Sequence, residues 1–169
     1  MAPPEFRLPM AYSWFFLIIE PISALVGAYY AFFRPQTYLQ LTDASSTPSA
    51  TDLPLSTNIT LTQLANLYFL FALNEALVLR STSDLRVWKA LLFALLLADF
   101  GHLYSVKGLG WSIYWNFWEW NSIAWGNVGF VYVGVAMRLA FLQGWGLNTE
   151  KAQQKAVRSQ ALAKGLKGN

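Results

Sequence analysis

The sequence contains no cysteine and only one histidine, His102, among its 169 residues. A chain without cysteine has no disulfide, no thiolate nucleophile and no cysteine-based metal site, and one histidine cannot form a multi-histidine site. Charged residues are also scarce, at 12%, whereas soluble domains usually hold about 25%. Hydrophobic residues make up 55% of the chain. We therefore expect an all-α integral membrane protein with neither a bound metal nor a cofactor.

The net charge of +3 is concentrated at the C-terminus. Residues 149–169 hold five basic side chains and one acidic side chain. A nucleic-acid interface needs a basic face on a folded domain, and no such face is visible here, so we expect no nucleic-acid partner. The pattern instead predicts a basic cytosolic tail beside anionic lipid.

Residues 1–148, which precede the tail, contain four apolar segments, at about 12–33, 61–79, 88–106 and 121–142. Each is close to the ~20 residues that a helix needs to cross a bilayer. The sequence therefore predicts a four-helix transmembrane bundle in direct contact with the lipid bilayer.

The loops between these segments predict the orientation. Basic residues cluster in 80–89 and in the tail, whereas the Ser-, Thr- and Pro-rich loop 34–60 holds one basic residue. Because basic loops stay on the cytoplasmic side, we expect both termini in the cytosol and loop 34–60 in the lumen. Asn58 begins an Asn-Ile-Thr glycosylation sequon in that loop, which agrees with this orientation and with a membrane of the endoplasmic reticulum.

Every predicted span contains side chains that hydrocarbon disfavours. These are Glu20, Asn66, Asn74, Glu75, Asp99, His102, Asn121 and Asn127. Intramembrane ionisable residues are rare and face the bundle interior, so each is a candidate functional residue. Arg138 is the one basic residue well inside a predicted span, and it falls near the cytosolic end of the fourth.

Two of the acids are predicted to share a layer of the membrane. At about 1.5 Å per residue, Glu20 lies roughly 12 Å and Asp99 roughly 16 Å from the cytosolic ends of their spans. His102 follows Asp99 by three residues and is its neighbour on the helix surface. We predict Glu20 and Asp99 as proton donor and acceptor and His102 as an orienting or relaying group, with Asn74, Glu75 and Asn127 lining a cavity. Structural hydrogen bonding between helices is the alternative for each of them.

Residues 111–125, "WSIYWNFWEWNSIAW", are unusually rich in tryptophan. An aromatic belt at the luminal interface explains this composition directly. The alternative is a lipophilic pocket wall, in which Trp118 contacts the substrate and indole faces stabilise a cation.

Small residues recur at four-residue spacing in the first span, at Ser23, Gly27 and Ala31, and the fourth span carries Gly134. This spacing favours close helix packing, either inside the bundle or between protomers of a homo-oligomer.

Pro21 directly follows Glu20 near the middle of the first span. Proline has no amide hydrogen, so the carbonyl of Leu17 loses its usual helical partner and the helix is expected to kink. Within a membrane that carbonyl needs another donor.

Several of these stretches resemble a known family. "IEPISALVGAYYAF" (19–32), "PQTYL" (35–39), "NE" (74–75) and "ADFGH" (98–102) are similar to a family of small four-span fungal membrane proteins. That resemblance extends to about residue 143 and implies the fold without an activity. A looser likeness, in size, topology and buried acids, is to the emopamil-binding protein and sigma-2 receptor group. It implies a cavity for sterols or cationic amphiphiles, and no catalytic residue is carried over from that group.

Together these features give two functional hypotheses. The first is an acid–base isomerase or cyclase that acts on a lipophilic sterol or terpenoid. The second is a non-enzymatic protein that binds lipid or sterol or assists membrane assembly. A transporter or channel is a third hypothesis and requires oligomers.

Overall fold

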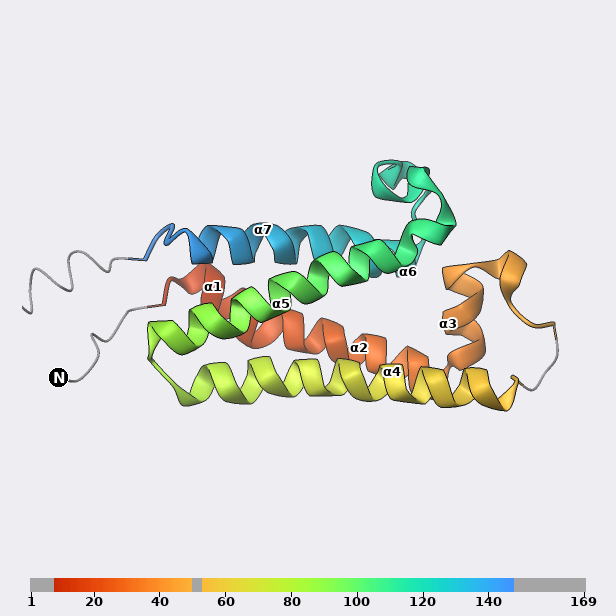
Figure 1. Ribbon diagram of the computed structural model, residues 1–169, viewed down its shortest axis with the longest axis horizontal. Coiled ribbons are helices and arrows are strands. Elements are labelled where there is room, and N and C mark those ends of the chain that lie inside the picture. Colours follow the sequence, from red (N-terminus) through yellow and green to blue (C-terminus); the bar gives the residue numbers. More distant parts are fainter. Residues whose placement is uncertain (1–7, 50–52, 148–169) are drawn as a thin grey trace, which may run out of the picture.

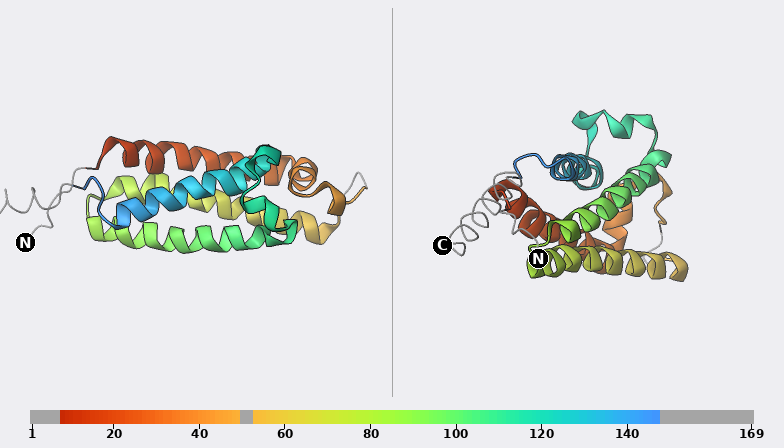
Figure 2. Two further views of the ribbon diagram at one scale, coloured as in Figure 1. Left: turned by 90° about the horizontal axis from the view of Figure 1, so that it is seen from above. Right: turned by 60° about the vertical axis from the view of Figure 1, so that its left-hand side comes forward.

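The computed structural model describes residues 8–49 and 53–147. Within these ranges the chain is helical and contains no strand, as the composition predicts. Four helices are long and apolar enough to cross a membrane: Met10–Phe33, Leu55–Ser81, Leu85–Leu109 and Ser122–Leu142. Figures 1 and 2 show these helices lying side by side along the long axis of the molecule. The basic tail of 149–169 lies outside the described residues.

The spanning helices consist of shorter elements. In chain order the α-helices are α1 (Met10–Trp14), α2 (Glu20–Phe33), α3 (Pro35–Thr42), α4 (Leu55–Leu73), α5 (Leu85–Ser105), α6 (Ser122–Ala124) and α7 (Val131–Leu142). Three π-helical segments interrupt them, at Phe15–Ile19, Asn74–Val78 and Trp125–Phe130. Short 3₁₀ turns occupy Ala44–Ser46, Leu79–Ser81, Val106–Leu109, Trp111–Tyr114 and Phe117–Glu119.

The helices form two antiparallel hairpins. The first hairpin is Met10–Phe33 with Leu55–Ser81, since α2 packs along α4 more extensively than any other pair of elements. The second hairpin is Leu85–Leu109 with Ser122–Leu142, in which α5 packs against α7. Residues 8 and 147 lie at one end of the bundle, as an even number of spans requires (Figure 1). The opposite end is called the luminal end below, following the orientation predicted from the loops.

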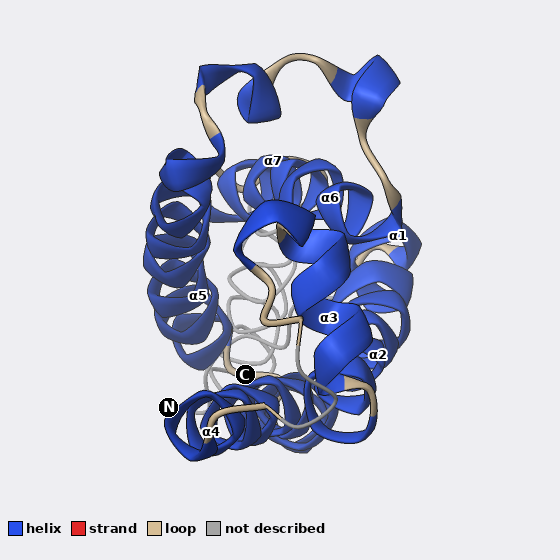
Figure 3. Ribbon diagram, turned by 90° about the vertical axis from the view of Figure 1, so that its right-hand side faces the viewer, coloured by secondary structure: helices blue, strands red, loops and turns tan. Residues whose placement is uncertain are grey.

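The predicted loop 34–60 contains more helix than expected. Its first part forms α3, which lies across the luminal end (Figure 3). Its last part is already α4, which begins at Leu55 rather than near 61. Asn58 is therefore an exposed residue in the first turns of a helix, because the polar "STNIT" stretch continues the helix beyond the apolar segment.

Asp84 and Arg86 stabilise the turn between the hairpins. Asp84 precedes α5 and accepts a hydrogen bond from the backbone N–H of Arg86, which caps the helix. Its carboxylate also pairs with the Arg86 guanidinium at 2.8 Å. The hydrogen bond from the Arg86 side chain holds the pKa of Asp84 below its ordinary value, and the bond from the Arg86 backbone N–H adds to this effect.

An aromatic core joins the two hairpins at the end that holds residues 8 and 147. Its buried members come from all four spanning helices and from the segment after α7: Tyr12, Phe15, Phe16, Leu79, Trp88, Leu92, Leu95, Phe141 and Leu147.

 Leu92 and Leu95 supply the α5 side of this core, and Phe141 stacks on Trp88 with ring centres 5.6 Å apart. The Tyr12 hydroxyl also donates to the carbonyl of Trp145 at 2.9 Å. Burial of these large side chains is the main apolar contact between the hairpins at this end.

A second contact between the hairpins lies at the luminal end. Here α3 packs against α6, and the Asn121 side-chain amide donates to the carbonyl of Leu41 at 2.7 Å. Ala31, Tyr38, Leu61 and Ala65 form a small buried core beside it. The hairpins are thus joined at both ends, and the polar residues of the spans lie between these joints.

The small residues of the first span do promote packing inside the bundle. Ala31 is buried, and a Cβ atom added at Gly27 would meet the Tyr68 ring of α4 at 3.4 Å. This supports the packing interpretation for the α2–α4 pair.

Candidate functional site

Four charged side chains meet between the two hairpins, and this group is called the Arg138 cluster below. Arg138 Nη1 donates to Asp99 Oδ2 at 2.9 Å. Arg138 Nη2 donates to Glu20 Oε1 at 2.6 Å and to Glu75 Oε1 at 3.4 Å. One guanidinium therefore contacts all three acids that the sequence places inside the spans.

The Arg138 cluster is closed to its surroundings. Arg138 and Glu75 are 0% exposed, Glu20 is 5% exposed and Asp99 is 7% exposed. The guanidinium carbon also lies 5.8 Å from the ring centre of Phe16 and 5.7 Å from that of Phe71. Aromatic faces at this distance attract a desolvated cation.

Each hairpin contributes two members of the cluster. Glu20 and Glu75 come from the first hairpin, and Asp99 and Arg138 come from the second. The ion pairs of Arg138 with Glu20 and Glu75 therefore cross from one hairpin to the other. The pair with Asp99 stays within the second hairpin and fixes the guanidinium in position.

Two of the π-helical segments position carboxyl groups of the cluster. The segment Phe15–Ile19 ends directly before Glu20, and Asn74–Val78 contains Glu75. These two segments also contact each other. A π-helical turn inserts an extra residue into the helical repeat and rotates the residues that follow it, and such turns are frequent at functional sites.

Gly134 makes room for the guanidinium one turn before Arg138. A Cβ atom added at Gly134 would lie 2.6 Å from Arg138 Nη1 and 3.4 Å from Glu20 Oε1. The pattern of small residues predicted a helix-packing role for Gly134, and the structure shows that this glycine accommodates a buried charged side chain.

The cluster has more acceptors than donors. Glu20 Oε2, Glu75 Oε2 and Arg138 Nε are buried without a hydrogen-bond partner among the described residues. Three carboxylates and one guanidinium together carry a charge of −2. The cluster is neutral only when two of its carboxyl groups hold a proton. Uncompensated charge is costly in a membrane, which favours this neutral form.

The Leu17 carbonyl, which loses its usual helical partner at Pro21, has a donor from another helix, as expected for a carbonyl inside a membrane. The Arg80 guanidinium, from the second spanning helix, donates to the carbonyl of Leu17. Pro21 itself occupies the first turn of α2, where a missing amide hydrogen is tolerated. The Glu20–Pro21 pair therefore marks the restart of the helix after a π-helical segment.

His102 lies apart from the ion pairs. It is half-buried one turn beyond Asp99, next to the backbone of Asn127, and its Nε2 has no partner among the described residues. No hydrogen bond joins His102 to any member of the cluster within 8–49 and 53–147. Asp99 and His102 are thus neighbours on the surface of α5, but no hydrogen bond joins their side chains among the described residues.

The other predicted binding residues are dispersed. Asn74 is half-buried beside Glu75, while Trp118 is 75% exposed in the luminal loop. Asn127 lines a separate pocket at the luminal end, and Asn66 lines a groove on the outside of the first hairpin. The structure brings Glu20, Glu75 and Asp99 together, but it does not bring Trp118, Asn127 or Asn66 to them.

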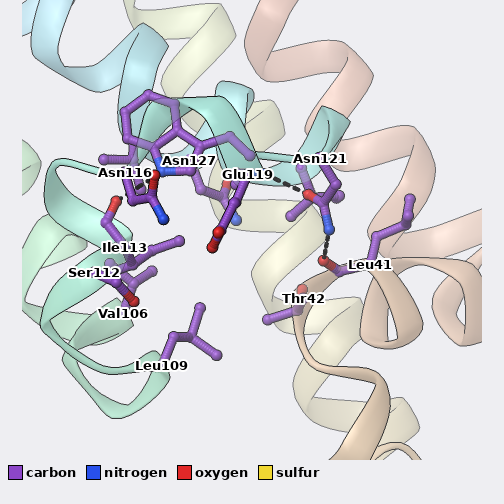
Figure 4. Close-up of a pocket in the computed structure, with 14 residues that line it drawn as sticks. Leu41, Thr42, Val106, Leu109, Ser112, Ile113, Asn116, Glu119, Asn121 and Asn127 are labelled. Atoms are coloured by element: carbon purple, nitrogen blue, oxygen red, sulfur yellow. Dashed lines mark hydrogen bonds between the residues drawn. The ribbon is translucent and has the colours of Figure 1, made fainter.

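Two pockets are present away from the cluster. The luminal pocket has a volume of about 160 Å³ and lies among α3, α6 and the loop of residues 106–121 (Figure 4). The outer groove has a volume of about 590 Å³ between α2 and α4, with Tyr29, Phe32 and Phe69 among its apolar walls. No member of the Arg138 cluster lines either of them. The described residues also contain no group of three or more His, Asp or Glu side chains arranged to hold a metal ion.

The role of Arg138 as the shared partner of the three acids was not predicted from the sequence. The sequence pattern marked Arg138 only as a basic residue near the cytosolic end of the fourth span. The signal that identifies it is charge pairing, since three acids in the other spans require a basic partner in hydrocarbon. Arg138 is the one basic residue available well inside a span.

The chain is similar to one known protein family. The family model described as "Domain of unknown function (DUF7704)" matches residues 5–148, and the chain belongs to this family. No curated protein and no solved structure matches the chain. The matched residues include both hairpins and every member of the Arg138 cluster, and they end before the basic tail.

Proposed function

We propose that this member of the DUF7704 family is a non-enzymatic integral membrane protein of the lipid-binding or membrane-assembly kind. In it the Arg138 cluster fixes two helical hairpins against each other. The observation that carries the proposal is the engagement of one buried guanidinium by all three intramembrane acids. A cluster built from two side chains of each hairpin suits a structural joint.

The surroundings of the acids support a structural role over a catalytic one. A general acid or base must come within hydrogen-bond distance of the atom that it protonates or deprotonates. Glu20 and Asp99 instead face Arg138, and neither lines the luminal pocket or the outer groove. A sterol or terpenoid would have to displace the guanidinium to reach them.

The proposal includes a membrane of the endoplasmic reticulum and a lipophilic small-molecule partner. Exposure of Asn58 near the luminal end supports access of the glycosylation machinery to the sequon. The large, mainly apolar outer groove supports contact with a sterol, a terpenoid or an acyl chain. Homo-oligomers are also compatible with the many exposed apolar side chains of the spans.

A second candidate function is an acid–base isomerase or cyclase. The observation in its favour is the acceptor excess of the cluster, because Glu20 Oε2 and Glu75 Oε2 have no partner among the described residues. Carboxyl groups that hold exchangeable protons in a closed site are suited to protonate an alkene or an epoxide. In this candidate Glu20 and Asp99 exchange the proton and His102 relays it.

The two candidates are separated by lipid mass spectrometry of three strains: wild type, a deletion, and Glu20→Gln. The glutamine keeps the shape of Glu20 but cannot deliver a proton. The non-enzymatic proposal predicts unchanged sterol and terpenoid isomers in all three strains. If the deletion and Glu20→Gln accumulate the same unconverted isomer while the variant protein reaches normal levels, the enzymatic candidate is correct.

A further inference from the structure

Glu119 is a carboxylate without a partner in the luminal pocket. It ends the 3₁₀ turn Phe117–Glu119, and its side chain points into the space between Ser112 and Thr42 (Figure 4). Among the described residues the side chain of Glu119 forms no hydrogen bond and no ion pair, while its backbone N–H donates to the carbonyl of Asn116 at 3.1 Å. Lys107 is the one basic residue in 106–121, and its ammonium is engaged by the ring and the hydroxyl of Tyr104.

Side-chain amides surround this carboxylate. Asn116, Asn121 and Asn127 all line the pocket. Asn121 is fixed, because it donates to the Leu41 carbonyl at 2.7 Å and accepts from the Ala124 backbone N–H at 2.9 Å. The side chains of Asn116 and Asn127 have no such bonds within the described ranges, so their carbonyl oxygens are available as acceptors for a ligand.

Trp120 forms an aromatic wall of the luminal pocket, and two contacts fix its position. Its indole N–H donates to the carbonyl of Ile113 at 2.9 Å, and its ring packs edge-to-face against Trp125 with centres 5.1 Å apart. A fixed indole beside a carboxylate is an arrangement that attracts organic cations. The hydrogen bond and the ring contact position Trp120 before any ligand binds.

The pocket carries one charge and has room for more than water. Glu119 is the only charged residue among those that line it. Its volume of about 160 Å³ exceeds the roughly 30 Å³ that one water occupies in the liquid. The surrounding loop is rich in tryptophan, and tryptophan in membrane proteins gathers at the level of the lipid headgroups.

From these observations we propose that the luminal pocket binds an alkylammonium group, with Glu119 as its counter-ion, Asn116 and Asn127 as hydrogen-bond acceptors and Trp120 as a cation–π partner. The ammonium belongs either to a lipid headgroup such as that of phosphatidylethanolamine or to a free amine. This site is independent of the Arg138 cluster and goes beyond the function proposed above.

The test measures ligand-induced shifts of the unfolding temperature of the full-length protein in detergent. The probes are ethanolamine, phosphatidylethanolamine and, as a lipid without an ammonium group, phosphatidylglycerol. A ligand that binds the folded state raises the unfolding temperature, and the rise grows as the ligand concentration exceeds the dissociation constant. We expect a shift with phosphatidylethanolamine and none with phosphatidylglycerol.

Two variants connect such a shift to the pocket. Glu119→Gln keeps the shape of the side chain and is expected to weaken binding at least tenfold. Asp43→Asn removes another acidic charge at the same end, outside the pocket lining, and is expected to retain the shift. Asn116→Ala provides a second site variant, with several-fold weaker binding expected.

The outcomes separate the two ammonium sources. A shift with phosphatidylethanolamine alone assigns the site to a lipid headgroup, and a shift with ethanolamine as well assigns it to alkylammonium groups in general. The proposal is overturned if neither probe shifts the unfolding temperature. It is also overturned if Glu119→Gln and Asn116→Ala respond as strongly as the wild type.

Discussion

Arg138→Met is expected to destabilise the protein by about 3–5 kcal/mol, the usual cost of removing one partner from a buried ion pair. Methionine fills much of the same volume, so the main loss is the guanidinium. Glu20, Glu75 and Asp99 then remain in a closed site without the donor that all three share. In thermal unfolding in detergent this corresponds to a decrease of roughly 6–20 °C for a chain of this size.

The matched control is Glu75→Gln. Glutamine keeps an oxygen toward Arg138 Nη2, whose contact with Glu75 is the longest of the three at 3.4 Å. It also removes one acid from a cluster with excess negative charge. We expect its free energy of unfolding to stay within about 1 kcal/mol of that of the wild type, the net value of an ordinary hydrogen bond. Equal destabilisation by Arg138→Met and Glu75→Gln would contradict the central role of the guanidinium.

Gly134→Ala is expected to disturb the same cluster sterically. The added methyl group would lie 2.6 Å from Arg138 Nη1, closer than two such atoms can approach. The guanidinium cannot move away freely because it is held by three carboxyl groups and enclosed by Phe16 and Phe71. Overpacking of this kind costs about 1–3 kcal/mol.

Gly126→Ala is the control for this change. It lies in the same spanning helix, but no neighbouring atom of the described residues lies within 4 Å of an added Cβ atom. Alanine at this open helical position is expected to be neutral or to stabilise by up to about 1 kcal/mol, because alanine loses less backbone entropy than glycine. Measured in parallel, Gly134→Ala should therefore lower the unfolding temperature, whereas Gly126→Ala should leave it unchanged or raise it. Identical behaviour would show that Gly134 does not accommodate the guanidinium.

The sequence predicted the architecture well because each span carries its own signal. Twenty or so apolar residues specify a spanning helix without reference to the rest of the chain. The ends of these helices were harder to predict, since polar stretches such as residues 55–60 extend α4 beyond its apolar segment. Helix α3 was missed because its mixed composition resembles a loop. The resemblance to small four-span fungal proteins stays a prediction.

The site was predicted in part. Glu20, Glu75 and Asp99 stand out because any acid inside a span is unusual, and the structure places all three in one cluster. Their common partner did not stand out, since an arginine near a helix end has an ordinary explanation at the membrane surface. Depth along a straight helix placed only Glu20 and Asp99 in one layer. That estimate ignored the π-helical segments and the reach of a long side chain.

The orientation of Trp118 could not be predicted from the local sequence pattern. A tryptophan-rich stretch predicts an aromatic surface, but it does not say which rings point toward a pocket. In the structure Trp120 lines the luminal pocket, whereas Trp118 stacks on Phe117 and is largely exposed. Such differences depend on the path of the loop between α5 and α6, and that path follows from contacts between distant residues, such as Tyr132 with the Tyr114 carbonyl.

The most direct test of the account is the coupling free energy between Arg138 and Glu20, whose ion pair crosses from one hairpin to the other. It is obtained from the unfolding free energies of the wild type, Arg138→Met, Glu20→Gln and the double variant. We predict a coupling of about 2 kcal/mol, because loss of the guanidinium removes the donor from which Glu20 Oε1 accepts its hydrogen bond. Additive effects, within about 0.5 kcal/mol, would mean that this pair does not hold the hairpins together.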